Sequence, residues 1–305
     1  MRKNLMFIAI ATLGLASCKG GFKQLDGGVL YNIHEDKSGP TIQPGDFMSL
    51  NLIMKTEGDS VLGSTYEIGT PSTNVMPKEQ RKGDITAAFL KLSEGDSATV
   101  KLTIDSILKK GVPRPPGIKG KYIVYEVKVE KVIPKGNLTD SVFQAKISDY
   151  LKAEADKIKA AEPAKLKKYV EDNKLKTTIT PSGLQYVITK PGTGPTAANG
   201  DTAVVNYTCK LLSGKFIQSS IKEVAIKEKA QIDPRQPFEP IHIPIGEGKV
   251  IKGWDEGLLL LNKGAKATFI IPSNLAWDEQ GAPSIPPYSP VVFDVEMVDI
   301  IHPKK

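Results

Sequence analysis

The stretch Val250-Ile251-Lys252-Gly253-Trp254-Asp255-Glu256-Gly257-Leu258 decides which fold this 305-residue chain is expected to have. A second stretch, WDEQGAPSIPPYSPVVFDVE, follows it at residues 277–296. Both combine aromatic and aliphatic side chains with glycine or proline. Such side chains are normally buried, so each residue taken singly predicts only a place in a core. The rest of the chain is needed to say what kind of core this is.

The chain contains an internal repeat. Gly28-Val29-Leu30-Tyr31-Asn32-Ile33 can be laid over Gly183-Leu184-Gln185-Tyr186-Val187-Ile188, and with small gaps the register holds as far as residues 124–127 over 292–295. Within each copy, a strand-like alternation of apolar and polar residues is interrupted by turns that contain Gly or Ser. The sequence therefore predicts two copies of one mainly β domain, over residues 27–135 and 177–303.

A helix is expected between the two copies. Residues 139–173 are rich in Lys and Ala, contain no glycine, and carry apolar residues at helical spacing: Val142, Phe143, Ile147, Tyr150, Leu151 and Ile158. Asn137 followed by Asp140 predicts a cap with a first-turn acid. Pro163 is expected to end this helix or to start a second one, because a proline inside a helix removes a hydrogen bond and clashes with the preceding turn. The apolar stripe needs a cover, which is either a neighbouring domain or a second protomer.

The two C-terminal stretches together resemble the core motifs of the FKBP-type peptidyl-prolyl isomerases, and Ser182-Gly183-Leu184-Gln185-Tyr186 is similar to the entry strand of the bacterial members. The resemblance covers residues 177–303. It implies an α+β fold in which a twisted antiparallel β-sheet wraps around one short helix, which would begin near Val250-Ile251 and run from Trp254 to Leu261. The expected architecture is therefore two FKBP-like domains joined by a helical linker at residues 136–176.

The same resemblance implies an apolar pocket with Trp254 as its floor. The full set of candidate catalytic residues is Tyr207, Ile217, Gln218, Ile241, Val250, Ile251, Trp254, Trp277, Ile285 and Phe293. Several of them depart from the family pattern. Ile217 and Ile241 stand where phenylalanine is usual, Gln218 stands where an aspartate is usual, and Trp277 replaces a tyrosine while keeping a hydrogen-bond donor. Phe238 is a candidate to supply the missing ring.

The implied reaction is cis–trans isomerisation of an X–Pro bond, which needs no nucleophile, metal or cofactor. Rotation about this bond breaks amide resonance, with a barrier of about 18–20 kcal/mol. A dry pocket that grips the proline ring favours the twisted, less dipolar transition state over the planar ground state. The Ile251 backbone N–H is the implied donor to the substrate carbonyl. The alternative interpretation is a non-catalytic FKBP-like module that binds a peptide or partner through an altered pocket.

The first copy lacks the aromatic residues of this pocket. The alignment pairs Leu52 with Tyr207, Leu62 with Ile217, Ile85 with Trp254 and Leu108 with Trp277, and it keeps one aromatic residue, Tyr125, opposite Phe293. Apolar replacements keep a core filled but remove the aromatic floor. We expect this degenerate copy to dimerise, to bind unfolded chain or to act as a spacer.

The N-terminus predicts export and lipid attachment. Arg2 and Lys3 precede an apolar run, which is typical of a secretory signal peptide over residues 1–17. Leu15-Ala16-Ser17-Cys18 resembles the bacterial lipobox, so Cys18 is the expected lipidation site at the head of a tether over residues 18–26, and an ordinary secreted protein is the alternative. Lys19, in place of an aspartate that resembles an inner-membrane retention signal, favours the outer membrane, facing either the periplasm or the outside.

The composition is that of an ordinary globular protein, with 40% hydrophobic and 25% charged residues. The formal net charge of +7 comes without the basic and aromatic pattern of a nucleic-acid-binding protein, so no nucleic-acid partner is expected. The expected partners are proline-containing polypeptides, the membrane through the N-terminal lipid, and a second copy of the chain through the first domain or the linker helix. With Cys18 acylated, Cys209 has no partner and is expected to be a small buried side chain.

Overall fold

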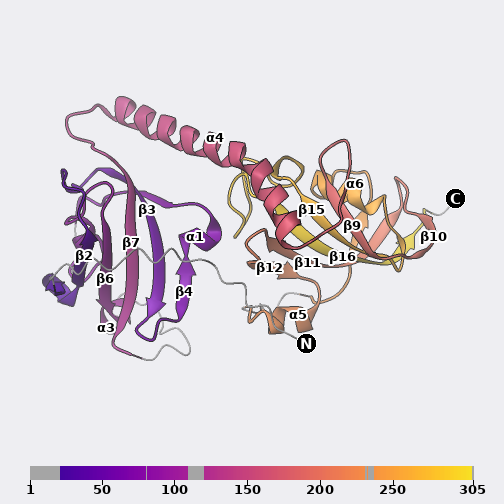
Figure 1. The fold of residues 1–305 in the computed structure, drawn as a ribbon, viewed down its shortest axis with the longest axis horizontal. Helices are drawn as coiled ribbons and strands as arrows, with labels where there is room; N and C mark the ends of the chain where they lie inside the picture. The colour runs from indigo at the N-terminus through magenta and orange to yellow at the C-terminus, as the bar shows by residue number, and fades with distance from the viewer. Residues whose placement is uncertain (1–20, 80, 109–119, 231, 233–236, 304–305) are drawn as a thin grey trace. The chain divides into compact units, whose positions relative to one another are not determined.

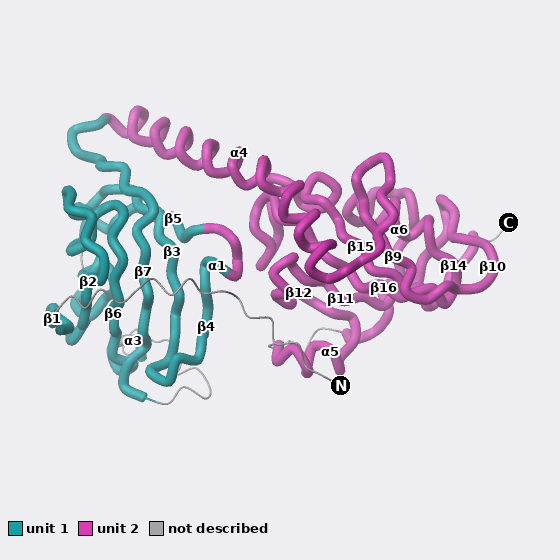
Figure 2. The backbone as a smooth tube through the Cα atoms, viewed as in Figure 1, with its two compact units in different colours: residues 1–66, 71–138 teal, residues 67–70, 139–305 magenta. Residues whose placement is uncertain are grey.

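The computed structural model describes residues 21–79, 81–108, 120–230, 232 and 237–303. The expected signal peptide and Cys18 lie outside these residues. The chain divides into two compact units, of which unit 1 comprises residues 1–66 and 71–138 and unit 2 comprises residues 67–70 and 139–305 (Figure 2). Among the described residues, no helix combines the length and the apolar character that crossing a membrane would require.

Unit 1 is built on a seven-stranded antiparallel sheet with strand order β1-β2-β6-β7-β3-β4, and β5 pairs with β3 (Figure 1). The strands are β1 (Lys23–Gln24), β2 (Leu30–Glu35), β3 (Phe47–Thr56), β4 (Val61–Ser64), β5 (Ser72–Val75), β6 (Ser97–Thr103) and β7 (Tyr122–Ile133). The short helices are η1 (Asp26–Gly28), α1 (Thr65–Ile68), α2 (Thr86–Phe89) and α3 (Ile104–Leu108). Phe89 of α2 belongs to the same buried cluster as Val100 and Val127 of the sheet, so the core lies between α2 and the sheet.

Unit 2 has a second seven-stranded antiparallel sheet with order β12-β11-β16-β15-β9-β8, and β13 pairs with β11. Its strands are β8 (Thr178–Ile179), β9 (Gln185–Lys190), β11 (Thr202–Leu211), β12 (Phe216–Ser219), β13 (Ile241–Pro244), β15 (Lys266–Ile271) and β16 (Val291–Ile301), and a separate two-stranded sheet joins β10 (Thr193–Thr196) to β14 (Asn262–Lys263). The helices are α4 (Asp140–Asp172), α5 (Lys222–Lys227), α6 (Lys252–Leu258) and η2 (Ser273–Leu275).

The two sheets have the same strand order and the same irregularities. The pairing of β3 with β7 shifts register between Ser49 and Leu50, and the pairing of β11 with β16 shifts between Val204 and Val205, which is the equivalent place in the repeat. The Leu52 N–H donates to Thr65 Oγ1 at 2.9 Å, as the Tyr207 N–H donates to Ser220 Oγ at 2.9 Å. The predicted α+β fold with two copies of one antiparallel domain is confirmed.

Helix α6 lies unusually close to β15, and two glycines make this possible. A Cβ atom added to Gly253 would lie 2.5 Å from Ile271 Cγ2, and one added to Gly257 would lie 2.8 Å from Phe269 Cε2. The helix ends at Leu258 and not at the expected Leu261, because the last turn tightens: the Leu261 N–H donates to the Leu258 carbonyl, three residues back.

Helix α4 runs without a break through Pro163, so the prediction that this proline ends the helix or starts a second one was wrong. The proline removes one hydrogen bond, but Glu162 and Leu166 are buried next to it and hold the helix on both sides. The predicted cap was also wrong, because the capping side chain is Thr139, whose Oγ1 accepts the Val142 N–H at 3.4 Å. Asp140 provides the first-turn acid, as expected.

The last turns of α4 are covered by the sheet of unit 2. Leu166 forms a buried cluster with Ile270 of β15 and Val292 of β16, and four half-buried residues pack against this cluster: Tyr169, Val170, Leu175 and Leu212. The end of α4 is therefore covered by the unit's own sheet, whereas the cover of the predicted stripe from Val142 to Ile158 stays a prediction.

Candidate functional site

A cavity of about 860 Å³ opens in unit 2 between α6 and the strands β11, β12, β13 and β16. All ten residues predicted for the site line it: Tyr207, Ile217, Gln218, Ile241, Val250, Ile251, Trp254, Trp277, Ile285 and Phe293. They come from positions up to 86 residues apart in the chain (207 to 293), so the fold brings together a set that the sequence disperses.

Three aromatic rings form the base of the cavity. The ring centroids of Trp254 and Phe293 lie 5.0 Å apart at 84°, and those of Trp254 and Tyr207 lie 5.4 Å apart at 83°. Both are edge-to-face contacts, which suit the charge distribution of aromatic rings. Trp254 is only 4% exposed, and its indole nitrogen has no hydrogen-bond partner among the described residues. The base is therefore largely apolar and shielded from water.

Strands β11 and β12 place the side walls. Cys209 pairs with Gln218 and Lys210 pairs with Phe216, so Ile217 is the extra residue of a bulge. A bulge bends the strand and redirects its side chains, which here brings both Ile217 and the exposed Gln218 to the cavity.

The start of α6 supplies a free backbone donor. Ile251 is the N-cap residue with extended backbone angles, and its carbonyl accepts the Trp254 N–H at 2.9 Å and the Asp255 N–H at 3.2 Å. The first N–H groups of a helix have no partner inside the helix. In the described part of the chain the Ile251 N–H makes no hydrogen bond, so it remains available to an acceptor in the cavity.

Asp255 holds the loop that leads to this donor. Its carboxylate accepts the Gly246 N–H and the Gly248 N–H, both at 3.1 Å. One side chain on the first turn of α6 thus fastens the segment just before Val250 and Ile251. Asp255 also lines the cavity, but with both oxygens engaged its role is structural.

The ionisable groups at the base of the cavity are held neutral. Burial raises the pKa of the Cys209 thiol to about 12, and burial, with a smaller effect of Cys209, raises the pKa of the Tyr207 hydroxyl above its usual value. Neither group loses a proton near pH 7. None of the three histidines lines the cavity.

Sequence reasoning missed several residues that line the cavity: Cys209, Gly248, Lys249, Lys252, Asp255, Ala276, Ala282 and Pro283. Cys209 was expected in the core, where it is indeed buried, but it also borders the cavity. The signal was available, because Cys209 lies two residues after Tyr207 and so faces the same side of β11. Phe238 does not line the cavity, so no ring from that position replaces the missing phenylalanine.

Apart from Tyr125, the counterpart of Phe293, the equivalent positions of unit 1 are aliphatic or small. The strand pairing places Gly63 where unit 2 has Gln218, and Ser72 where it has Ile241. Helix α2 begins only after Ile85, the counterpart of Trp254, and therefore lacks the first turn that α6 provides. Leu62 and Leu108 are 38% and 36% exposed. Unit 1 keeps the framework of the site without its aromatic base or its helix start.

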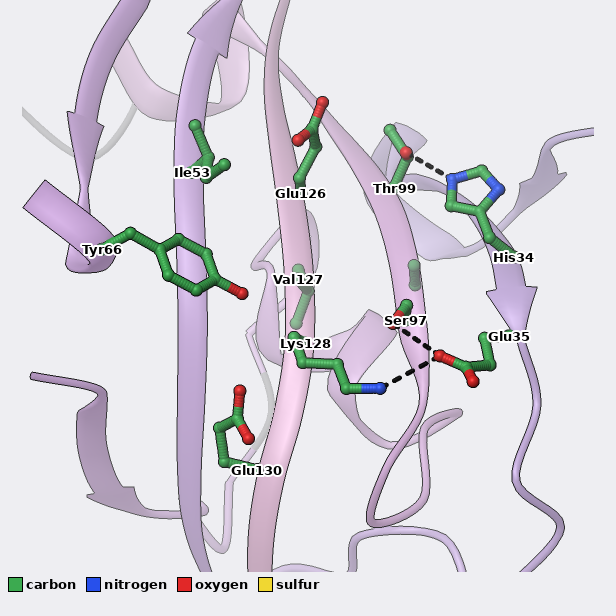
Figure 3. Close-up of a pocket in the computed structure, with 11 residues that line it drawn as sticks. His34, Glu35, Ile53, Tyr66, Ser97, Thr99, Glu126, Val127, Lys128 and Glu130 are labelled. Carbon is green, nitrogen blue, oxygen red and sulfur yellow. Dashed lines mark hydrogen bonds and ion pairs between the residues drawn. The ribbon is translucent and has the colours of Figure 1, made fainter. Parts of the chain in front are cut away.

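A second depression, of about 500 Å³, lies on the sheet of unit 1 (Figure 3). Its polar side chains largely satisfy one another. His34 hydrogen-bonds to Thr99 Oγ1 at 2.6 Å, and Glu35 Oε2 accepts from Lys128 Nζ at 3.1 Å. Within the described residues no group of three or more His, Cys, Asp or Glu side chains is placed to hold a metal ion. We therefore find the better candidate site in unit 2.

An antiparallel sheet packed on one short helix, with a tryptophan-based apolar cavity at the start of that helix, defines the class of protein. Residues 194–298 match the family model of the FKBP-type peptidyl-prolyl cis-trans isomerases, and this part of the chain belongs to that family.

Curated proteins that are similar to this chain are named as isomerases of the same family. The FKBP-type peptidyl-prolyl cis-trans isomerase FkpA of Aeromonas hydrophila is 34% identical over 201 residues, which is 65% of this chain and 66% of that protein. FkpA of Escherichia coli strain K12 is 35% identical over 53% of this chain and 55% of its own length. The crystal structure of FkpA from Escherichia coli covers 55% of this chain and 76% of that chain, with 32% identity and a TM-score of 0.42. The chain thus spans between about half and two thirds of the length of these curated relatives.

Proposed function

We propose that this protein is a peptidyl-prolyl cis-trans isomerase that acts on proline-containing polypeptides through unit 2. The observation that carries the proposal is the cavity in which all ten expected residues meet around three aromatic rings. The family match of residues 194–298 supports the same reaction.

The cavity suits a reaction that needs no group transfer. The planar X–Pro amide is stabilised by resonance, and the barrier to its rotation is about 18–20 kcal/mol. As the bond twists, the carbonyl becomes less dipolar, so a dry apolar site disfavours the twisted state less than it disfavours the planar one. Trp254 and its two ring neighbours receive the proline ring, and the walls of Ile217, Ile285 and Val250 exclude water.

Two polar groups orient the substrate. The Ile251 N–H, which has no partner in the described part of the chain, donates to a substrate carbonyl. This hydrogen bond holds the peptide in place and leaves the X–Pro amide free to twist. Gln218, exposed at the rim, offers hydrogen bonds but no charge, so the site depends on desolvation and ring contact more than on an acid.

We further propose that the protein is exported and anchored to the outer membrane by lipid on Cys18. The support is the sequence Leu15-Ala16-Ser17-Cys18 after a positive and then apolar N-terminus. Its substrates would then be secreted or outer-membrane polypeptides. A homodimer formed through unit 1 or α4 is the proposed assembly, on the basis of the exposed apolar residues Leu62 and Val142.

A matched pair of substitutions tests the isomerase proposal in the full chain. Trp254→Leu keeps an apolar side chain but removes the flat ring, and kcat/KM for a proline tetrapeptide should fall about tenfold or more. Ile85→Ala also removes side-chain bulk, at the equivalent position of unit 1, and should leave kcat/KM unchanged. A folded Trp254→Leu variant with full activity would contradict the assignment, and wild-type protein that binds proline peptides without catalysis would favour the binding-module alternative.

A further inference from the structure

A side chain of helix α4 forms hydrogen bonds with the segment of this chain that precedes the cavity residues Ala276 and Trp277. Glu162 is 8% exposed, and its Oε1 accepts the Ser273 N–H at 2.7 Å while its Oε2 accepts the Ser273 hydroxyl at 2.5 Å. Ser273 itself is 2% exposed. One carboxylate thus binds both donors of a single buried residue 111 positions further along the chain.

Ser273 in turn holds the segment that carries Trp277. Its carbonyl accepts two N–H groups, those of Ala276 and Asp278, both at 2.9 Å. These two donors stand on either side of Trp277 in the sequence, and Ala276 and Trp277 both line the cavity. The donors of Ser273 face α4 and its acceptor faces the Trp277 turn, so the residue links the helix to the wall of the site.

A second contact reaches the other end of the same loop. Lys159, one turn before Glu162 on α4, places Nζ 5.7 Å from the centre of the Tyr288 ring. The Tyr288 N–H donates to the Asp278 carbonyl at 2.7 Å, which closes the loop next to Trp277. One carboxylate oxygen of Asp278 is buried without a partner among the described residues. The carboxylate whose hydrogen bonds reach this turn, through Ser273, is that of Glu162.

A carboxylate is a costly residue to bury if only packing is needed. Leu166, one turn later, already packs α4 on Ile270 and Val292. Burying a charge is unfavourable unless hydrogen bonds compensate it, and Glu162 has no ion-pair partner within the described residues. Unlike a leucine, the carboxylate forms two hydrogen bonds of defined geometry, and these fix the position of Ser273.

We propose that Glu162 is a positioning residue of the candidate isomerase site: through Ser273 it fixes the Trp277 wall, so that α4 is part of the support of the cavity. The inference rests on the proposed function of the cavity. It can nevertheless be tested without catalysis, because the position of the Trp277 indole is measurable by itself.

The test compares Glu162→Ala with Glu171→Ala, a matched loss of a carboxylate from an exposed position on the same helix. The chain has only two tryptophans, Trp254 and Trp277, so a ¹H–¹⁵N spectrum contains two indole signals. Glu162→Ala should shift or broaden the Trp277 signal and lower kcat/KM about three- to tenfold, mainly through KM. Glu171→Ala should change neither. Trp277→Phe assigns the signal.

Two further variants separate positioning from folding. Glu162→Gln keeps an oxygen for the Ser273 N–H and an amide that can donate to the hydroxyl, so it should restore the wild-type signal and KM. Ser273→Ala removes only the hydroxyl and should give a smaller shift in the same direction; it decides the question if Glu162→Ala fails to fold. An unchanged Trp277 signal in folded Glu162→Ala or in Ser273→Ala would overturn the proposal, as would an equal effect of Glu171→Ala. Wild-type protein without isomerase activity would refute the proposed function and leave the indole measurement to judge the positioning.

Discussion

Cys209 is both a core residue of β11 and a part of the cavity wall. It is 2% exposed, and burial raises the pKa of its thiol to about 12. Because the thiolate is the reactive form, only about one molecule in ten thousand would carry it at pH 8. In a Cys18→Ser background, a thiol reagent should therefore label native protein far more slowly than protein unfolded in denaturant. Rapid labelling of the native protein would contradict this assignment of a buried, neutral thiol.

The same neutral groups predict how the reaction depends on pH. The pKa of Tyr207 and the pKa of Cys209 are both raised above their usual values. Each group therefore stays protonated up to a higher pH than usual, and neither titrates near pH 7. No histidine lines the cavity. We expect kcat/KM to be nearly flat from about pH 6 to about pH 8 in a protease-free isomerisation assay. A bell-shaped profile in that range would show that acid–base chemistry had been overlooked.

At the level of single residues, the sequence was most informative where several residues formed one motif. The ten site residues were found because two long motifs appear in order, and the structure places all ten around one cavity. Their catalytic roles stay predictions. Glu162 could not be found in this way, because in the sequence it is one acid among many on a lysine-rich helix. Only its burial against Ser273 distinguishes it.

Among the elements, α6 depends most on side-chain size. In Gly257→Ala the new Cβ would lie 2.8 Å from the Phe269 ring, so the helix or the ring must move. Alanine gains up to about 1 kcal/mol in helix propensity, while overpacking a core costs about 1–3 kcal/mol. We expect a net loss of about 1 kcal/mol in the free energy of unfolding of unit 2, measured by urea titration. Gly21→Ala is the control, because nothing lies within 4 Å of the added atom, and an equal loss there would remove the packing explanation.

Strands were easier to predict than helix ends. Alternating residues reveal a half-buried strand directly, and the repeat supplied each strand twice. The end of α4 depended on tertiary contacts that no local pattern records: Pro163 favours a break, and the buried neighbours Glu162 and Leu166 prevent it. The cap was misplaced by two residues for a similar reason, since Asn137 and Thr139 are both good caps by type and only the backbone decides between them.

For the whole molecule, the proposed anchor makes a simple prediction. If Cys18 carries the lipid, Cys18→Ala should abolish incorporation of labelled fatty acid and move the protein from the membrane to the soluble fraction, because the acyl chains that anchor it are lost. The matched control is Cys209→Ala, which removes the other cysteine of the chain and should leave membrane partition unchanged. Membrane-bound Cys18→Ala protein would refute the lipid anchor.

The placement of the tryptophans makes intrinsic fluorescence a probe of unit 2 alone. Both tryptophans line the cavity of unit 2, and unit 1 has none. Selectively excited tryptophan emission therefore follows only the unfolding of unit 2, whereas far-ultraviolet circular dichroism sums both units. Multidomain chains often depart from a single all-or-none transition. Where tryptophan emission and circular dichroism diverge along a denaturant titration, the difference between them reports the unfolding of unit 1. No substitution or added dye is needed.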